Sequence, residues 1–165
     1  MDRPTPVLEF RGDTLDDPAV RALLREHLLT AASLSPPESV HALDDSGLRG
    51  PGVRFWSVWC NDTLVGMCAL KALTPAHGEI KSMRTAAAWL RRGVGDAMMR
   101  HLLAQARGMG LERLSLETGS AEPYAPARRL YARHGFAFCD PFEPYVEDPH
   151  SRFMTRLLND GRDAR

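Results

Sequence analysis

The stretch from Gly78 to Met99, GEIKSMRTAAAWLRRGVGDAMM, constrains the fold more than any other part of this sequence. It reads as a strand, a short turn marked by two arginines and two glycines, and the first turns of a helix. A helix that begins directly after such a turn leaves backbone N–H groups at its N-terminus without partners. Because these donors and the helix dipole favour an anion, the stretch predicts a phosphate-binding site between a strand and a helix.

Length and composition indicate one globular domain. The chain has 165 residues, of which 44% are hydrophobic and 25% charged, and its formal net charge is zero. These values predict a single domain over residues 1–158 and a disordered tail over residues 159–165. The balanced charge lacks the positive field that drives binding to nucleic acid, so we expect no nucleic-acid partner.

The sequence also lacks the marks of a membrane, secreted or metal-binding protein. No run approaches the ~20 apolar residues that span a bilayer, and the first ten residues contain no apolar signal segment. The cysteines, Cys60, Cys68 and Cys139, and the six histidines are scattered without metal-type spacing. We therefore expect a cytoplasmic protein with no metal and no membrane partner, either a monomer or a homodimer.

The pattern of hydrophobic residues predicts an α+β fold. Antiparallel strands come first, joined by a hairpin turn at Asn61-Asp62-Thr63, and a strand–helix–strand unit follows. Residues 44–52, rich in turn formers, are expected to form a loop. The expected strands span residues 7–10, 54–60, 64–73, 79–85, 114–117, 136–139 and 152–158. The expected helices are one from Asp17 to the prolines at 36–37, and those at 39–43, 93–110 and 125–134.

Three kinds of phosphate site compete for the arginine–glycine turn. A P-loop is excluded because the Lys-Ser/Thr pair that it requires is absent. A dinucleotide fingerprint would start at Gly93 but has Met98 at its third glycine position. The third alternative is coenzyme A: Gly93 and Gly95 would let the backbone approach its pyrophosphate, and Arg91 and Arg92 would add charged contacts.

This turn resembles motif A of the GNAT superfamily of N-acetyltransferases, Gln/Arg-x-x-Gly-x-Gly/Ala. A second segment, ARRLYARHGF at residues 127–136, is similar to the family signature AxxLYxxxGF. The resemblance extends over residues 7–158. It implies a mixed, mostly antiparallel sheet flanked by helices, with a central strand–helix–strand unit that binds coenzyme A. It also implies acetyl transfer from acetyl-CoA to a primary amine of a small molecule or peptide, by direct attack on the thioester.

Three positions depart from the family pattern. Leu90 occupies the Gln/Arg position, Asp96 stands where many members have a basic or hydroxyl residue, and Tyr124 stands where the family often has Asn. Leu90 and Tyr124 keep an alternative open, a non-catalytic acyl-CoA-binding or regulatory module. The residues that the resemblance assigns to coenzyme A are Met83, Arg84, Thr85, Arg91, Arg92, Gly93, Val94, Gly95, Asp96, Tyr124 and Arg128.

The resemblance also implies catalytic roles. Tyr131 matches the signature tyrosine that protonates the leaving thiolate, and its pKa of about 10 lies near the thiol value of about 8.5. Glu79 is the leading candidate for the general base, because some members carry a catalytic glutamate at this spacing before motif A. Pairing of Glu79 with Lys81 on a solvated face is an equal alternative, and Glu117 is the alternative base.

The acceptor site is assigned by charge alone. Tyr145, Glu147 and Asp148 lie in an acidic loop that would attract a cationic amine before its deprotonation. A solvated turn is the competing interpretation. Three basic residues would permit an acceptor that also carries a carboxylate: Lys81, Arg84 and Arg128.

Overall fold

The computed structural model describes residues 6–12 and 14–158, and the tail expected at residues 159–165 lies outside them. Its seven strands form one sheet in the order β1-β2-β3-β4-β5-β7-β6. Within this sheet β4 and β5 are parallel and the other neighbouring strands are antiparallel. The strands are β1 (Glu9–Gly12), β2 (Val53–Cys60), β3 (Thr63–Ala72), β4 (His77–Thr85), β5 (Arg113–Gly119), β6 (Ala137–Cys139) and β7 (Ser151–Leu157).

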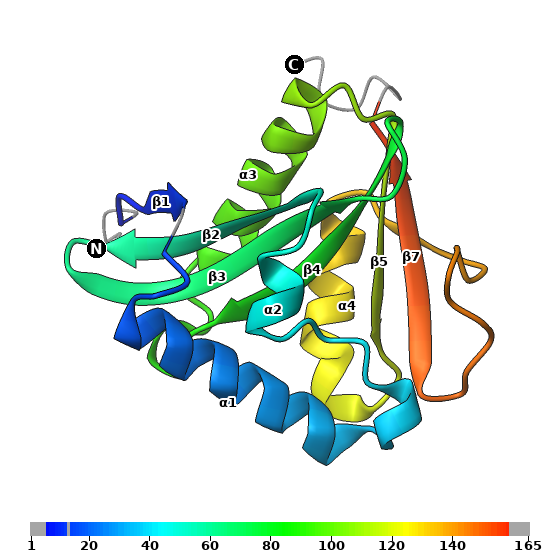
Figure 1. Cartoon of the computed structure of the whole chain (residues 1–165), viewed down its shortest axis with the longest axis horizontal. Coiled ribbons are helices and arrows are strands. Elements are labelled where there is room, and N and C mark those ends of the chain that lie inside the picture. The colour runs from blue at the N-terminus through cyan, green and yellow to red at the C-terminus, as the bar shows by residue number, and fades with distance from the viewer. Residues whose placement is uncertain (1–5, 13, 159–165) are drawn as a thin grey trace.

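Four α-helices and three short 3-10 turns complete the described chain (Figure 1). The α-helices are α1 (Pro18–Leu34), α2 (Asp45–Leu48), α3 (Val94–Gly108) and α4 (Ala125–Arg133). The 3-10 turns are η1 (Pro37–Ser39), η2 (Ala87–Trp89) and η3 (Glu122–Tyr124). This α+β architecture, with a mostly antiparallel sheet flanked by helices, confirms the predicted fold class.

The helices cover both faces of the sheet, and each face has its own hydrophobic core. On one face α1 and α2 bury Val20, Leu24 and Leu48 against side chains of β2 and β3. On the other face α3 and α4 pack a larger cluster that includes Met98 and Leu102. Figure 1 shows α1 and α2 in front of the sheet, with α3 and α4 behind it. The sheet is therefore buried on both sides over its central strands.

The parallel pair requires the predicted strand–helix–strand unit. Parallel neighbours cannot be joined by a tight turn, so the chain leaves β4, crosses one face as α3 and returns as β5. Gly110, with φ of 78°, ends the crossover helix as the expected left-handed residue beyond its C-cap, Met109. This connection places the first turn of α3 next to the end of β4.

Three expectations about local structure are wrong. The helix expected at residues 39–43 is absent; the chain instead forms η1 and, inside the expected loop, α2. Asp44 starts α2, because its carboxylate accepts a hydrogen bond from the Gly47 backbone N–H at 2.8 Å. The first strand also lies two residues later than expected, where it pairs with β2.

No helix among residues 6–12 and 14–158 is long and apolar enough to cross a membrane.

Candidate active site

The candidate site lies where β4 and β5 separate. Their backbone pairing ends at Ile80 and Leu116. Directly after this pair β4 contains a bulge at Ser82, whose φ of 52° lies in the left-handed region. A bulge bends its strand, and Figure 1 shows β4 diverging from β5 beyond this point. The β4 edge over residues 81–85 therefore faces an opening rather than a paired strand.

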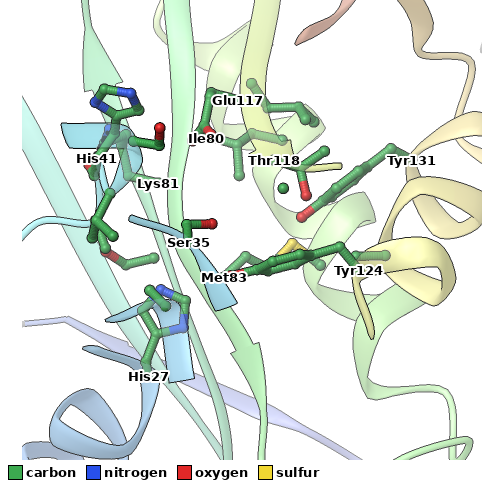
Figure 2. Close-up of a pocket in the computed structure, with 18 residues that line it drawn as sticks. His27, Ser35, His41, Ile80, Lys81, Met83, Glu117, Thr118, Tyr124 and Tyr131 are labelled. Atoms are coloured by element: carbon green, nitrogen blue, oxygen red, sulfur yellow. Dashed lines mark hydrogen bonds between the residues drawn. The ribbon is translucent and has the colours of Figure 1, made fainter. Parts of the chain in front are cut away.

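A cavity of about 140 Å³ lies in this opening. Residues of β4 and β5 form its centre. Tyr124 and Tyr131 point into it from the side of η3 and α4, and His27, Ser35 and His41 lie on the opposite side (Figure 2). The cavity thus passes between the two strands and has one wall on each face of the sheet.

Tyr131 is held firmly in the wall on the α4 side. Its side chain is 8% exposed and packs edge-on to Phe136, with ring centroids 6.4 Å apart. Burial raises the pKa of the Tyr131 phenol to about 12, and the nearby Glu117 carboxylate adds to this effect. The hydroxyl therefore keeps its proton at neutral pH, as a proton donor must.

Tyr124, which stands where the family often has Asn, packs on the end of β5. A Cβ atom placed on Gly119 would overlap its ring, so the absence of a side chain at Gly119 lets Tyr124 lie there. Burial raises the pKa of the Tyr124 phenol as well, with a further contribution from Glu117. The cavity therefore contains two protonated phenols within the field of one carboxylate.

Glu117 is the carboxylate that lines the cavity. It accepts a hydrogen bond of 2.9 Å from the Ser151 hydroxyl. Burial raises its pKa to about 7, although the Ser151 hydrogen bond and the Lys81 charge oppose this shift. A carboxylate with this pKa is half ionised near neutral pH, which suits a general base.

Glu79 does not line the cavity. It is 2% exposed, and its carboxylate accepts hydrogen bonds from the Tyr145 hydroxyl at 2.5 Å and the Lys81 ammonium at 3.3 Å. The expected pairing with Lys81 is therefore present, but in a buried cluster rather than on a solvated face. Of the two carboxylates proposed as the base, Glu117 is the one that reaches the cavity.

The acidic loop before β7 contacts the cavity wall from outside. Tyr145 joins the Glu79–Lys81 cluster, and Asp148 accepts a hydrogen bond of 2.5 Å from the Ser39 hydroxyl. Glu147 is exposed, and none of these three loop residues is part of the cavity lining. Tyr145 and Asp148 therefore support the segment that carries Ser39 and His41, while Glu147 stays outside the site.

The arginine–glycine turn lies at the start of α3, as expected. Gly93 is the N-cap with φ of 85°, and no side chain among the described residues caps the first N–H groups of the helix. Arg91 also adopts a left-handed conformation, with φ of 60°, and the Arg92 guanidinium lies over the Trp89 ring at 4.0 Å. Leu90, in the family's Gln/Arg position, is 59% exposed. The backbone donors of this turn therefore remain free of side-chain caps.

Three further motif residues anchor α3. Val94 is 1% exposed in the core, and Gly95 lies so close to α4 that a Cβ atom there would approach Leu130 to 3.0 Å. Asp96 accepts a hydrogen bond of 2.7 Å from the His134 ring and lies 3.4 Å from the Arg133 guanidinium. Asp96 therefore binds the first turn of α3 to the end of α4, and its charge is compensated there.

The basic residues assigned to coenzyme A make contacts within the chain. Arg84 donates to the Glu26 carboxylate of α1 at 2.9 Å, and Arg128 donates to the Gly119 carbonyl at 2.6 Å. Met83 lines the cavity, whereas Thr85 is the last residue of β4. Arg84 and Arg128 thus tie the ends of the two diverging strands to their neighbours.

Sequence reasoning missed the wall formed by α1 and the residues after it. His27, Ser35, Ser39 and His41 line the cavity, but no motif marks them. Their position depends on how α1 crosses the sheet, and periodicity indicates only which face of α1 is buried. Desolvation, with a contribution from Arg84, lowers the pKa of His27 to about 4, so this wall is uncharged at that position.

Among the described residues, no group of three or more His, Cys, Asp or Glu side chains could hold a metal ion.

Comparison with known proteins identifies the family. The profile of the acetyltransferase (GNAT) family matches residues 20–136. The N-acetyltransferase YsnE of Bacillus subtilis is 51% identical to this chain over 151 residues, which cover 92% of this chain and all of YsnE.

Solved structures share the fold. An acyl-CoA N-acyltransferase from Klebsiella pneumoniae superposes with a TM-score of 0.73 at 24% identity, covering 92% of this chain and 98% of its own. A GNAT acetyltransferase from Elizabethkingia anophelis, solved with acetyl-CoA bound, superposes with a TM-score of 0.68 at 17% identity, covering 94% and 99%. The chain therefore belongs to the GNAT acetyltransferase family and is by class an acetyl-CoA-dependent N-acetyltransferase.

Proposed function

We propose that this protein transfers the acetyl group of acetyl-CoA to a primary amine of a small molecule or peptide, by direct attack of the amine on the thioester. The observation that carries this proposal is the meeting of Tyr131 and Glu117 at one cavity between the diverging strands. The Tyr131 phenol keeps its proton at neutral pH, whereas the Glu117 carboxyl readily gains and loses one. Acyl transfer to an amine needs such an acid and such a base.

The residues around the turn before α3 fit the pyrophosphate of acetyl-CoA. Around Gly93 there is open space, since a Cβ atom placed there would meet nothing within 4 Å. Within the described part of the chain the first N–H groups of α3 have no side-chain cap, and Arg91 and Arg92 are exposed beside them. These features favour a phosphate group at the helix N-terminus.

The proposed mechanism assigns one proton transfer to each residue. Acetyl-CoA supplies an acetyl thioester when bound. Glu117 accepts the proton that the amine loses as its nitrogen bonds to the acetyl carbon. Tyr131 donates its phenolic proton to the sulfur as the carbon–sulfur bond breaks. Met83, Arg84 and Thr85 carry the β4 edge whose backbone groups are assigned to the pantetheine arm and the thioester carbonyl. Proton exchange with solvent then restores Glu117 and Tyr131.

Glu79 is assigned a supporting role in this scheme, instead of the role of base. Its carboxylate already accepts hydrogen bonds from Tyr145 and Lys81, and it is buried away from the cavity. We therefore propose that Glu79 holds Lys81 and Tyr145 in place, and that Glu117 is the base.

A panel of amines with detection of the released thiol tests the proposed function. We expect amine-dependent release of coenzyme A together with a product that is 42 mass units heavier than the amine, roughly the mass added by acetylation. A protein that binds acetyl-CoA but releases no thiol with any amine would support the alternative, a non-catalytic acyl-CoA-binding module.

A further inference from the structure

The described lining of the cavity contains one lysine, Lys81, and all three donors of its ammonium group are used. An ammonium group has three N–H donors. Those of Lys81 point to the His41 carbonyl at 3.1 Å, the Tyr145 hydroxyl at 2.8 Å and the Glu79 carboxylate at 3.3 Å. The side chain is only 9% exposed. Lys81 therefore neutralises Glu79 and has no donor left for a substrate carboxylate.

The neighbouring arginines also pair within the chain, although the buried Arg84 Nε has no hydrogen-bond partner among the described residues. Arg84 pairs with Glu26 at 2.9 Å, and Arg128 donates to the carbonyls of Gly119 and Ala121 at 2.6 and 3.2 Å. Neither arginine is part of the cavity lining, whose other basic residues are the histidines of α1 and the following segment. One of these, His27, is neutral near pH 7 because its pKa is lowered to about 4.

Carboxylates, in contrast, lie in the cavity and near it. Glu117 lines the cavity, and both Glu79 and Asp148 lie close enough for their charges to raise its pKa. Lys81 balances one of these three charges. An ammonium group is therefore attracted to the part of the cavity beside Glu117, and a carboxylate on the same substrate is repelled.

We infer that the acceptor amine has no carboxylate beside it, so that its class is primary amines of the decarboxylated type rather than α-amino acids. This inference rests on the proposed function and narrows its substrate. An α-carboxylate brought into this cavity would lose water and meet no lysine or arginine in the described lining that is free to pair with it, a cost that strongly reduces affinity. The small volume of about 140 Å³ would also hold the carboxylate near Glu117.

Matched pairs of compounds test the inference. The full-length protein is assayed with acetyl-CoA and three pairs that differ only by a carboxylate: tyramine and tyrosine, histamine and histidine, cadaverine and lysine. We expect kcat/KM to be at least about tenfold higher for the amine than for the amino acid in each pair that reacts. Equal or higher values for the amino acids would overturn the inference but leave acetyl transfer intact. Failure of all six compounds to release thiol, despite binding of acetyl-CoA, would overturn both.

A substitution in the cavity wall tests the cause of the preference for amines over amino acids. It adds an ammonium group that is free to pair with a substrate carboxylate. Ser35, the C-cap of α1, lines the cavity, and Ser33 is exposed in the last turn of α1, outside the cavity lining. We expect Ser35→Lys to reduce the preference for the amine over its amino acid by about tenfold, because the new ammonium can pair with the carboxylate. Ser33→Lys is the matched control and should leave the preference unchanged. An unchanged preference in Ser35→Lys would contradict the inference.

Discussion

At the scale of single residues, Glu117 and Tyr131 enter the same cavity from different elements. Glu117 comes from β5 and Tyr131 from α4. Burial raises the pKa of both, to about 7 for the carboxyl and about 12 for the phenol. The two values leave a wide pH range in which the first group is a base and the second an acid, which is the condition for transfer of two protons in opposite directions.

Replacing the base should change the pH dependence as well as the rate. In the wild-type protein kcat/KM should rise as the pH passes about 7, where Glu117 loses its proton. Glu117→Gln should lower kcat by roughly 100-fold or more and remove this rise. The measurement is kcat/KM from pH 5.5 to 9, with Glu112→Gln, at an exposed position just before β5, as the control.

The stability of the same variant separates a catalytic effect from misfolding. The pKa of Glu117 in the folded protein is raised above its ordinary value of 4.5, so the folded state binds this proton more tightly than the unfolded chain. Ionisation of Glu117 therefore costs stability as the pH rises, and Glu117→Gln should be at least as stable as the wild type at pH 8. A pH profile like that of the wild type in Glu117→Gln would exclude Glu117 as the base.

At the scale of elements, the turn before α3 depends on contacts with α4. Gly95 packs on Leu130, and Asp96 receives a hydrogen bond from His134. The hydrogen bond from His134 lowers the pKa of Asp96, with the Arg133 charge adding to the effect. The charge of Asp96 is thus used to join two helices, and the first turn of α3 keeps its backbone donors for a phosphate.

Removing this charge should loosen the helix pair without abolishing catalysis. Asp96→Asn should lower the free energy of unfolding by about 1 kcal/mol and the Tm by roughly 2–4 °C at pH 7. Because the folded pKa is lowered, the stabilisation is present above the unfolded value, about 4, and is lost as the pH falls through the folded value. Thermal unfolding at pH 7 and pH 3 checks this, with Asp62→Asn in the exposed hairpin turn as control. A Tm difference that persists undiminished at pH 3 would contradict the role of the charge.

At the scale of the whole molecule, the separation of β4 and β5 leaves an opening through the sheet between the two helix layers. A ligand bound in this opening would contact residues from both helix layers and would therefore hold the two layers together. Acetyl-CoA at 100 times its Kd should stabilise the protein by about 2.7 kcal/mol, and the Tm should rise by roughly 5–11 °C. NAD at the same concentration should cause no shift, since the chain lacks the dinucleotide fingerprint. A shift with NAD and none with acetyl-CoA would refute the assigned ligand.

The sequence predicts the elements of the fold better than the walls of the site. The hairpin turn and the glycine beyond α3 are local signals, and both appear in the structure. The structure has Gly93 at the start of α3 and Tyr131 in α4 beside the cavity, where the motifs predict a turn and a helix, because each motif lies within one turn or helix.

Residues that act through distant contacts were harder to place. The choice of Glu79 or Glu117 as the base depends on Tyr145, which lies 66 residues beyond Glu79. The Tyr145 hydroxyl donates a hydrogen bond to the Glu79 carboxylate. The bulge at Ser82 bends β4 away from β5, and nothing in the expected strand over residues 79–85 indicates it. Ser35 and His41 reach the cavity through the path of α1 across the sheet, which no local pattern specifies.

The most direct test of the central claim compares the wild type with Tyr131→Phe under the same conditions, using an amine that the wild type acetylates. The measurement is the rate of coenzyme A release at saturating acetyl-CoA and amine, with the Kd for acetyl-CoA determined in parallel. If Tyr131 protonates the sulfur, kcat should fall by roughly 100-fold or more while the Kd stays within about twofold, because the ring and its packing remain. An unchanged kcat in Tyr131→Phe would show that the proposed acid is wrong.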